Sequence, residues 1–322
     1  MDLFDAFNIK KNIKTLDADA LRKMIMSEAK RVIHEAMLSE RANPEKVDPK
    51  RFPLKLSDAQ TDPDPESKVT GGLDDGETDE DKIDAVKGTL PVGDLKPSQS
   101  SMDIKKACQF FIAALRKVTP FPNGPGGDLG AIITSDDHIM DGHHRWIATG
   151  MVDPSASVGG FIVDFPAKQM IAALNMITAS LGEEGKAGTG GFDQFNEQGV
   201  AAMLDKLATE GTWSGKPEEI LAALKEFTQS DSSDKDELVA AAAKKVAENL
   251  SELTLAVPNG FPERPDMPVI SAKAGHLKQA INLLKTGAVD LNPPYAESAN
   301  ESVSSEKNFL TERWERLAGL LE

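Results

Sequence analysis

Several residue types are scarce in this chain, and each scarcity argues against a class of protein. Cys108 is the single cysteine, so an internal disulfide cannot form and a secreted disulfide scaffold is not expected. No apolar run approaches the roughly 18–20 residues that a membrane-spanning helix needs, and the first residues lack the layout of a signal peptide. We therefore expect a protein of the reducing cytoplasm, or of a particle assembled there, with no membrane partner.

Basic residues are also in the minority. The chain has 36 Lys and Arg against 52 Asp and Glu, which gives a formal net charge of −16. A chain this acidic is repelled by the phosphate backbone of DNA or RNA unless a basic patch offsets the field. Non-specific nucleic-acid binding is therefore not expected, whereas a small anion held in a local pocket is compatible with the composition.

Composition and hydrophobic period divide the chain into five segments. Residues 1–41 predict an N-terminal amphipathic helix, and residues 42–87 predict an acidic linker, because they are rich in Asp, Glu, Pro and Gly and have no apolar period. Residues 88–182 predict a compact domain, residues 183–296 a mainly helical extension that returns to it, and residues 297–322 a C-terminal amphipathic helix. The two terminal helices are candidate docking elements, whose apolar faces would pack within this chain, on a protein partner or on a second copy of the chain.

The order of the elements predicts the fold class. Apolar, β-branched runs such as AIITS and VGGFIVDF indicate buried strands, and amphipathic stretches surround them. The predicted class is α+β, with a small mixed β-sheet core and extensive helical additions. Helices are expected over residues 101–118, 166–180, 194–209, 217–228, 235–252 and 273–286.

Histidine is scarce as well, yet three of the five histidines lie in the stretch DDHIMDGHHRWIATG at residues 136–150. A predicted strand, HIMD, ends there, and a glycine precedes a predicted helix start. The first backbone N–H groups of a helix have no internal acceptors, and the helix dipole is positive there, so this junction favours an anion. Gly142 allows the backbone to approach a ligand closely. The side chains around it supply charge, hydrogen-bond donors and a group that can transfer a proton; they are Asp141, His143, His144 and Arg145.

Two other interpretations of this stretch stay open. The HHR turn could be a purely structural turn whose hydrogen bonds are satisfied within the protein. His138, Asp141 and one of the adjacent histidines could instead bind zinc or iron, although they do not have the spacing of a common metal motif.

Other features of the sequence suggest packing or loops. The segment GKAGTGG, residues 185–191, resembles a phosphate loop in composition but lacks the Gly-Lys-Ser/Thr ending, so a flexible loop is expected. Trp213 and Trp314 are expected to be packing anchors. Trp146, directly after the HHR turn, is expected to be a wedge in the core, with base stacking as the alternative.

The segment MDGHHRWIA resembles the second motif of the ParB/sulfiredoxin superfamily. ParB-type members carry a glycine, an acidic residue or histidine, a histidine or arginine, and then an arginine. Sulfiredoxins carry Gly-Gly-Cys-His-Arg followed by an aromatic residue. The segment VGDLKPSQ is similar to the opening strand and Leu-x-Pro segment of the family, and the order of strands and helices agrees. The resemblance covers roughly residues 88–182.

The resemblance implies a nucleotide-binding protein that takes ATP or CTP with Mg²⁺ and transfers or hydrolyses phosphate. Arg145 would stabilise charge, His144 or Asp141 would move a proton, and Asp141 would contact the metal. The Arg145→Ala variant is then expected to lose nucleotide binding with little loss of fold. The phosphate-binding residues would be Gly142, His143, His144 and Arg145, joined by looser analogy by Lys96, Ser98, Ser101 and Lys105.

The sequence also departs from this family. His143 stands where sulfiredoxins have their reactive cysteine, so redox repair is not implied. Asn175 lacks the accompanying Glu and Arg of the third motif of partition proteins, so CTP switching is not implied. The terminal LTERWERLAGLL resembles short end peptides of phage proteins, which implies a phage source and a place in the host cytoplasm or the virion. Two alternative functions are a virion or assembly protein that keeps the fold without catalysis, and a ParB-like DNA nuclease.

Overall fold

The computed structural model describes residues 51–73, 81–187, 190–256, 260–270 and 275–291. The two predicted terminal helices lie outside these ranges, and their docking role stays a prediction.

The centre of the molecule is a five-stranded mixed β-sheet with the order β1-β5-β3-β4-β2. β1 pairs antiparallel with β5, β5 pairs parallel with β3, β3 pairs antiparallel with β4, and β4 pairs parallel with β2. The predicted α+β class with a mixed sheet is therefore confirmed. The strands are β1 (Ala85–Pro91), β2 (Lys96–Pro97), β3 (Gly127–Thr134), β4 (His138–Asp141) and β5 (Ser157–Val163).

Helices cover both faces of the sheet, which explains why its central strands are apolar without alternation. Successive side chains of a strand point to opposite faces, and the neighbours Ile132 and Ile133 of β3 accordingly belong to two separate hydrophobic clusters. Ile139 and Met140 of β4 divide in the same way. Both faces of the sheet therefore contribute to the hydrophobic core.

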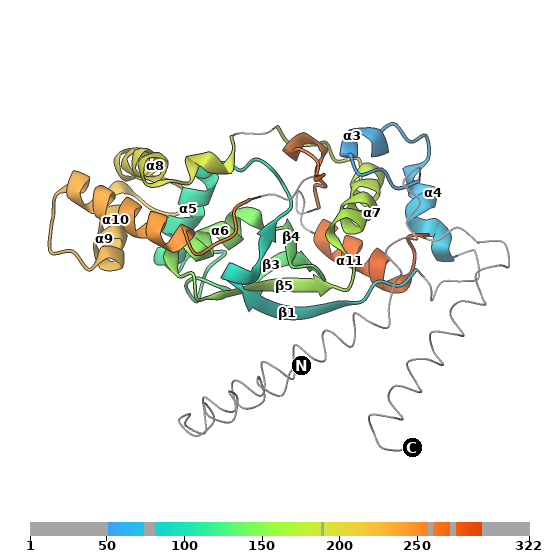
Figure 1. The fold of residues 1–322 in the computed structure, drawn as a ribbon, viewed down its shortest axis with the longest axis horizontal. Helices are drawn as coiled ribbons and strands as arrows, with labels where there is room; N and C mark the ends of the chain where they lie inside the picture. Colours follow the sequence, from blue (N-terminus) through green and yellow to red (C-terminus); the bar gives the residue numbers. More distant parts are fainter. Residues whose placement is uncertain (1–50, 74–80, 188–189, 257–259, 271–274, 292–322) are drawn as a thin grey trace, which may run out of the picture.

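Each cluster contains its own set of helices. The first joins the sheet to α5 (Ile104–Leu115), α6 (His143–Val152), α8 (Glu197–Glu210), α9 (Pro217–Thr228) and α10 (Lys235–Leu250). The second joins it to α3 (Leu56–Ala59), α4 (Pro65–Thr70), α7 (Ala167–Ser180) and α11 (His276–Thr286). Figure 1 shows α8, α9 and α10 gathered at one end of the molecule. No helix in the described ranges is long and apolar enough to cross a bilayer.

Short 3-10 turns connect several of these elements. They are η2 (Gly71–Leu73), η3 (Val92–Asp94), η4 (Phe192–Gln194) and η5 (Arg264–Asp266). The last of them brings an arginine to the functional site described below.

The prediction of an acidic linker over residues 42–87 is wrong for the part that the structure describes. Residues 51–73 contain α3 and α4, which contact α7, and their buried side chains are Phe52, Leu56, Ala59 and Val69. These apolar residues are spaced widely among acidic ones, so the overall composition of the segment indicated a linker and not packed helices. One of the acids has a local role, since the side chain of Asp64 accepts the Ser67 N–H at 3.2 Å and caps α4.

The beginning and the end of the described chain are joined to one another. Arg51 Nη2 lies 2.7 Å from Asp290 Oδ2, and the Leu291 N–H donates to Asp81 Oδ1 at 2.8 Å. The Gly72 N–H also donates to the Ala288 carbonyl at 3.1 Å. We call these three contacts the clasp; they close the face of the sheet that α7 covers.

Candidate functional site

The predicted strand-to-helix junction is present at the end of β4. β4 ends at Asp141, Gly142 caps the helix with a φ of 99°, and α6 begins at His143. A Cβ on residue 142 would lie 3.1 Å from Ala131 Cβ and 3.4 Å from Arg145 Nη2. Glycine is therefore required here both for its left-handed backbone and for the close approach of β3.

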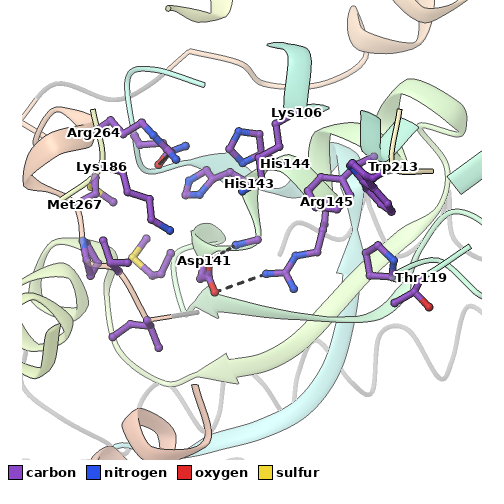
Figure 2. Close-up of a pocket in the computed structure, with 18 residues that line it drawn as sticks. Lys106, Thr119, Asp141, His143, His144, Arg145, Lys186, Trp213, Arg264 and Met267 are labelled. Carbon is purple, nitrogen blue, oxygen red and sulfur yellow. Dashed lines mark hydrogen bonds and ion pairs between the residues drawn. The ribbon is translucent and has the colours of Figure 1, made fainter. Parts of the chain in front are cut away.

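Residues 141–145 all line one cavity of about 460 Å³, which is drawn in Figure 2. The other walls come from α5, from the segment after α7, from the turn between α8 and α9, and from residues 264–270. A volume of this size is within the range of small-molecule sites. The junction that the sequence singled out thus forms one wall of a concave site assembled from several distant segments.

Four cationic side chains line this cavity, and each comes from a different segment. They are Lys106 of α5, Arg145 of α6, Lys186 after α7 and Arg264 of η5, whereas Asp141 is the one acidic residue among the described lining residues. Partial burial, followed by the nearby Lys186 and Arg264, lowers the pKa of Lys106. Like charges that gather in a strongly acidic chain raise the local potential, and a bound anion would relieve their repulsion.

The guanidinium of Arg145 makes a hydrogen bond that supports the fold, and it also lines the cavity. Its Nη1 donates to the Leu129 carbonyl at 2.6 Å, and its Nη2 lies 3.6 Å from Asp141 Oδ2. Asp141 Oδ1 also accepts the Gly142 N–H at 2.9 Å. The structure therefore differs from the expectation of a whole guanidinium available to phosphate, because one of its terminal nitrogens holds β3.

His143 is buried and has a partner within the protein. The Ser98 N–H donates to His143 Nε2 at 3.2 Å, while Ser98 Oγ donates to the Ile139 carbonyl at 2.6 Å. Because Nε2 accepts this bond, the neutral ring carries its proton on Nδ1. Burial, then the charges of Arg264 and Arg145, lowers the pKa of His143 to about 3. The ring is therefore uncharged at neutral pH.

His144 is buried to a similar degree and lacks such a partner. Its Nε2 has no hydrogen-bond partner among the described residues. Burial, then the charges of Lys106 and Arg264, lowers the pKa of His144 to about 2. A buried polar atom without a partner is uncommon in native proteins, and it is a position where a ligand, an ion or a water molecule can complete the hydrogen bonding.

Gln99 lines the same cavity as the histidines and also has a buried nitrogen atom without a hydrogen-bond partner in the part of the chain that the structure describes. Its Oε1 accepts a hydrogen bond from Arg264 Nη1 at 2.9 Å, which holds η5 against the segment before α5. Its Nε2 is buried without a partner among the described residues. Two lining side chains, Gln99 and His144, therefore present nitrogen atoms that the protein itself does not satisfy.

The four residues added by looser analogy do not line the cavity. Lys96 belongs to β2, Ser98 holds His143, and Ser101 forms a bridge with Gly191. Lys105 is exposed. The predicted loop and helix are at the site, but Gln99 and Lys106 are the residues that reach it. Successive residues of a helix are rotated by about 100°, so Lys105 and Lys106 face different directions.

Sequence reasoning missed Lys186, Arg264 and Trp213. Lys186 lies in the GKAGTGG segment, whose composition was a signal, although the segment was expected to be only a flexible loop. Arg264 lies in a proline-rich loop that carries no recognisable pattern. Both reach the cavity through the tertiary fold, with more than 75 residues of chain between them.

The tryptophans divide between core and cavity. Trp146 is fully buried, and its Nε1 donates to the Val92 carbonyl at 3.0 Å, which confirms the core wedge. Trp213 packs on Phe110 as expected of a packing anchor, but it is also 57% exposed and lines the cavity. Trp314 lies outside the described residues.

The described residues contain no group of three or more His, Cys, Asp or Glu side chains that could hold a metal ion. His138 instead stacks on Phe261 at 4.9 Å, with its Nδ1 3.4 Å from Asp136 Oδ1. A single carboxylate such as Asp141 fits a Mg²⁺ ion that takes its remaining ligands from water and from substrate phosphates.

Comparisons with models of known protein families, with curated proteins and with solved structures give no match to this chain. Function is therefore inferred from the site itself.

Proposed function

We propose that this protein binds a nucleotide through its phosphates in the cavity at the start of α6. The observation that carries the proposal is the convergence of four cationic side chains from four segments on one cavity, in a chain whose net charge is −16. ATP or CTP, with Mg²⁺, are the ligands that the ParB/sulfiredoxin resemblance implies. The protein would act in the host cytoplasm or the virion.

The site has complementary features for a phosphate chain. Lys106, Lys186 and Arg264 supply charge, and the positive end of the α6 dipole adds to it. Gln99 and His144 have buried nitrogen atoms that need partners. Asp141 would share a Mg²⁺ ion with the phosphates. The net charge of −16 disfavours a nucleic-acid polymer and has a weaker effect on a small anion that enters the cavity.

Phosphoryl transfer or nucleotide hydrolysis is the activity we propose at this site, with Asp141 holding Mg²⁺ against the transferred phosphate. The pKa of His144, about 2, makes the ring a weak base in the ligand-free protein. A general base works best when its pKa is near the working pH, so His144 is better suited to hydrogen bonding than to proton transfer. Arg145 would stabilise charge through Nη2, because Nη1 is held by Leu129.

Adjacent lysines allow a matched test of the binding site. Lys105 and Lys106 of α5 are both exposed, but only Lys106 lines the cavity. Calorimetric titration with ATP, CTP and tripolyphosphate, each with Mg²⁺, should show that Lys106→Gln weakens binding about tenfold or more, because a charge-assisted contact contributes roughly 1.5–3 kcal/mol. Lys105→Gln should bind as the wild type does.

Two results would contradict the proposal. One is the absence of binding to all three ligands at millimolar concentration by the wild type. The other is an equal effect of the two lysine substitutions, which would indicate a general charge effect. The first result would favour a virion or assembly protein without a nucleotide. The ParB-like nuclease is the least supported alternative, because the cavity has one carboxylate and two-metal nuclease sites need more.

A further inference from the structure

One wall of the cavity contains an exposed aromatic side chain. Trp213 is 57% exposed, compared with 53% for Leu73 and 52% for Val86. It lies on the turn between α8 and α9, outside the segment that resembles ParB and sulfiredoxin proteins. Exposed tryptophan commonly marks a binding surface, since its large ring loses little entropy when it is covered.

The turn that carries Trp213 is fixed by several hydrogen bonds. Thr212 and Gly215 form a bridge, with the Thr212 N–H donating to the Gly215 carbonyl at 2.8 Å. Arg116, which follows the last residue of α5, donates to the Ser214 carbonyl and pairs with Glu219 at 2.8 Å. These contacts hold an exposed side chain in a defined position, as a preorganised binding surface requires.

The ring itself is docked on one side. Trp213 meets Phe110 edge to face, with ring centroids 5.7 Å apart and an interplanar angle of 75°. Phe110 meets the buried Phe121 in the same manner at 6.2 Å. This series of rings connects Trp213 to the core, while more than half of its surface stays open to solvent.

Two of the four cationic side chains lie away from the aromatic side of the cavity, whereas Lys106 Nζ lies 5.9 Å from the ring centroid of Phe110, on which Trp213 packs. In Figure 2, Lys186 and Arg264 lie at one end of the view, and Trp213 and Thr119 lie at the other, with Arg145 between them. A ligand that uses both ends must combine a negatively charged chain with a flat apolar group. A nucleotide has this form, with phosphates at one end and a base at the other.

We propose that Trp213 is the stacking platform for the base of the bound nucleotide, with the phosphates at the end of the cavity that holds Lys186 and Arg264. This inference rests on the proposed nucleotide binding and adds the position of the base. Stacking on an aromatic side chain accepts any base, because every base has a π face. Trp213 therefore contributes to affinity for ATP and CTP alike, and base selectivity must come from other contacts.

Two ligands separate the base from the phosphates. Wild type, Trp213→Ala and Trp213→Phe should be titrated with Mg-ATP and with Mg-tripolyphosphate, after their thermal unfolding has been compared. Trp213→Ala should weaken ATP binding about tenfold and leave tripolyphosphate within about twofold. Trp213→Phe keeps a flat ring and should retain most of the ATP affinity. ATP should also quench tryptophan fluorescence in the wild type and much less in Trp213→Phe.

Each other outcome has a defined meaning. If tripolyphosphate binds the wild type and Trp213→Ala leaves ATP affinity unchanged, the platform is wrong and phosphate binding stands. If Trp213→Ala weakens both ligands equally, Trp213 acts through the structure of the turn and the platform is again wrong. If neither ligand binds the wild type, nucleotide binding and the platform both fail.

Discussion

The two sides of the cavity are built in different ways. The inner side is the β4–α6 junction, where His143 bonds to Ser98 and Arg145 holds the Leu129 carbonyl. The outer side consists of Lys186, Arg264 and Trp213 on connecting segments. On the inner side the same side chains support the fold and form the site, so a substitution changes both. On the outer side Arg264 also bonds to Gln99 and Trp213 packs on Phe110, whereas Lys186 is exposed, so the two roles are most separable at Lys186.

The largest expected effect is the pH dependence that the inner side gives the protein. His143 and His144 have folded pKa values of about 3 and about 2, against about 6.5 in an unfolded chain. The unfolded chain therefore binds more protons below pH 6.5, and the free energy of unfolding falls as the pH is lowered. The loss is up to about 1.4 kcal/mol per pH unit for each ring between pH 6 and 4.

Urea denaturation between pH 7.5 and 5 measures this dependence before most carboxylates titrate. The His143→Gln, His144→Gln double variant should lose most of the slope, and each single variant should lose part of it. An unchanged slope in the double variant would show that the two rings titrate normally in the folded protein.

The next effect concerns the glycine at the junction. Gly142→Ala should lower the free energy of unfolding by about 2–3 kcal/mol, because the new Cβ is forced into a left-handed backbone and against Ala131. Gly182→Ala is the matched control, since Gly182 has a φ of +65° and would have nothing within 4 Å of a Cβ. Denaturation should show a clearly smaller loss for the control, and equal losses would remove the steric part of the explanation.

The smallest effects separate the two sides directly. Arg145→Ala should cost about 1–3 kcal/mol of stability in addition to ligand affinity, because the Leu129 carbonyl loses its partner. The sequence alone predicted little loss of fold, and the bond to Leu129 is the reason for the larger stability loss expected here. Lys186→Gln should weaken ATP about tenfold and change stability by less than about 0.5 kcal/mol. Denaturation and calorimetry on both variants test the comparison, which fails if Lys186→Gln destabilises the protein as much as Arg145→Ala.

The same division explains what the sequence could predict. The inner side follows from local signals, because a strand, a left-handed glycine and a helix start are adjacent in the chain. Lys106 was missed by one residue, since the sequence does not fix how α5 is rotated about its axis. Arg264 and Trp213 reach the cavity only through the packing of segments that are distant in the sequence. The residues around them in the chain carry no pattern that predicts this position. In residues 51–73, the apolar side chains that pack on α7 were too few to outweigh the acidic composition.

The clasp has a consequence for how the protein is made. Its contacts join Arg51 to Asp290 and Asp81 to Leu291, residues more than 200 positions apart. A ribosome produces the chain from its N-terminus, so residues 51–73 emerge long before the partners that hold them in place. The α7 face of the sheet therefore stays incompletely covered during most of synthesis, and the last part of the domain can close only when the final segments have left the exit tunnel.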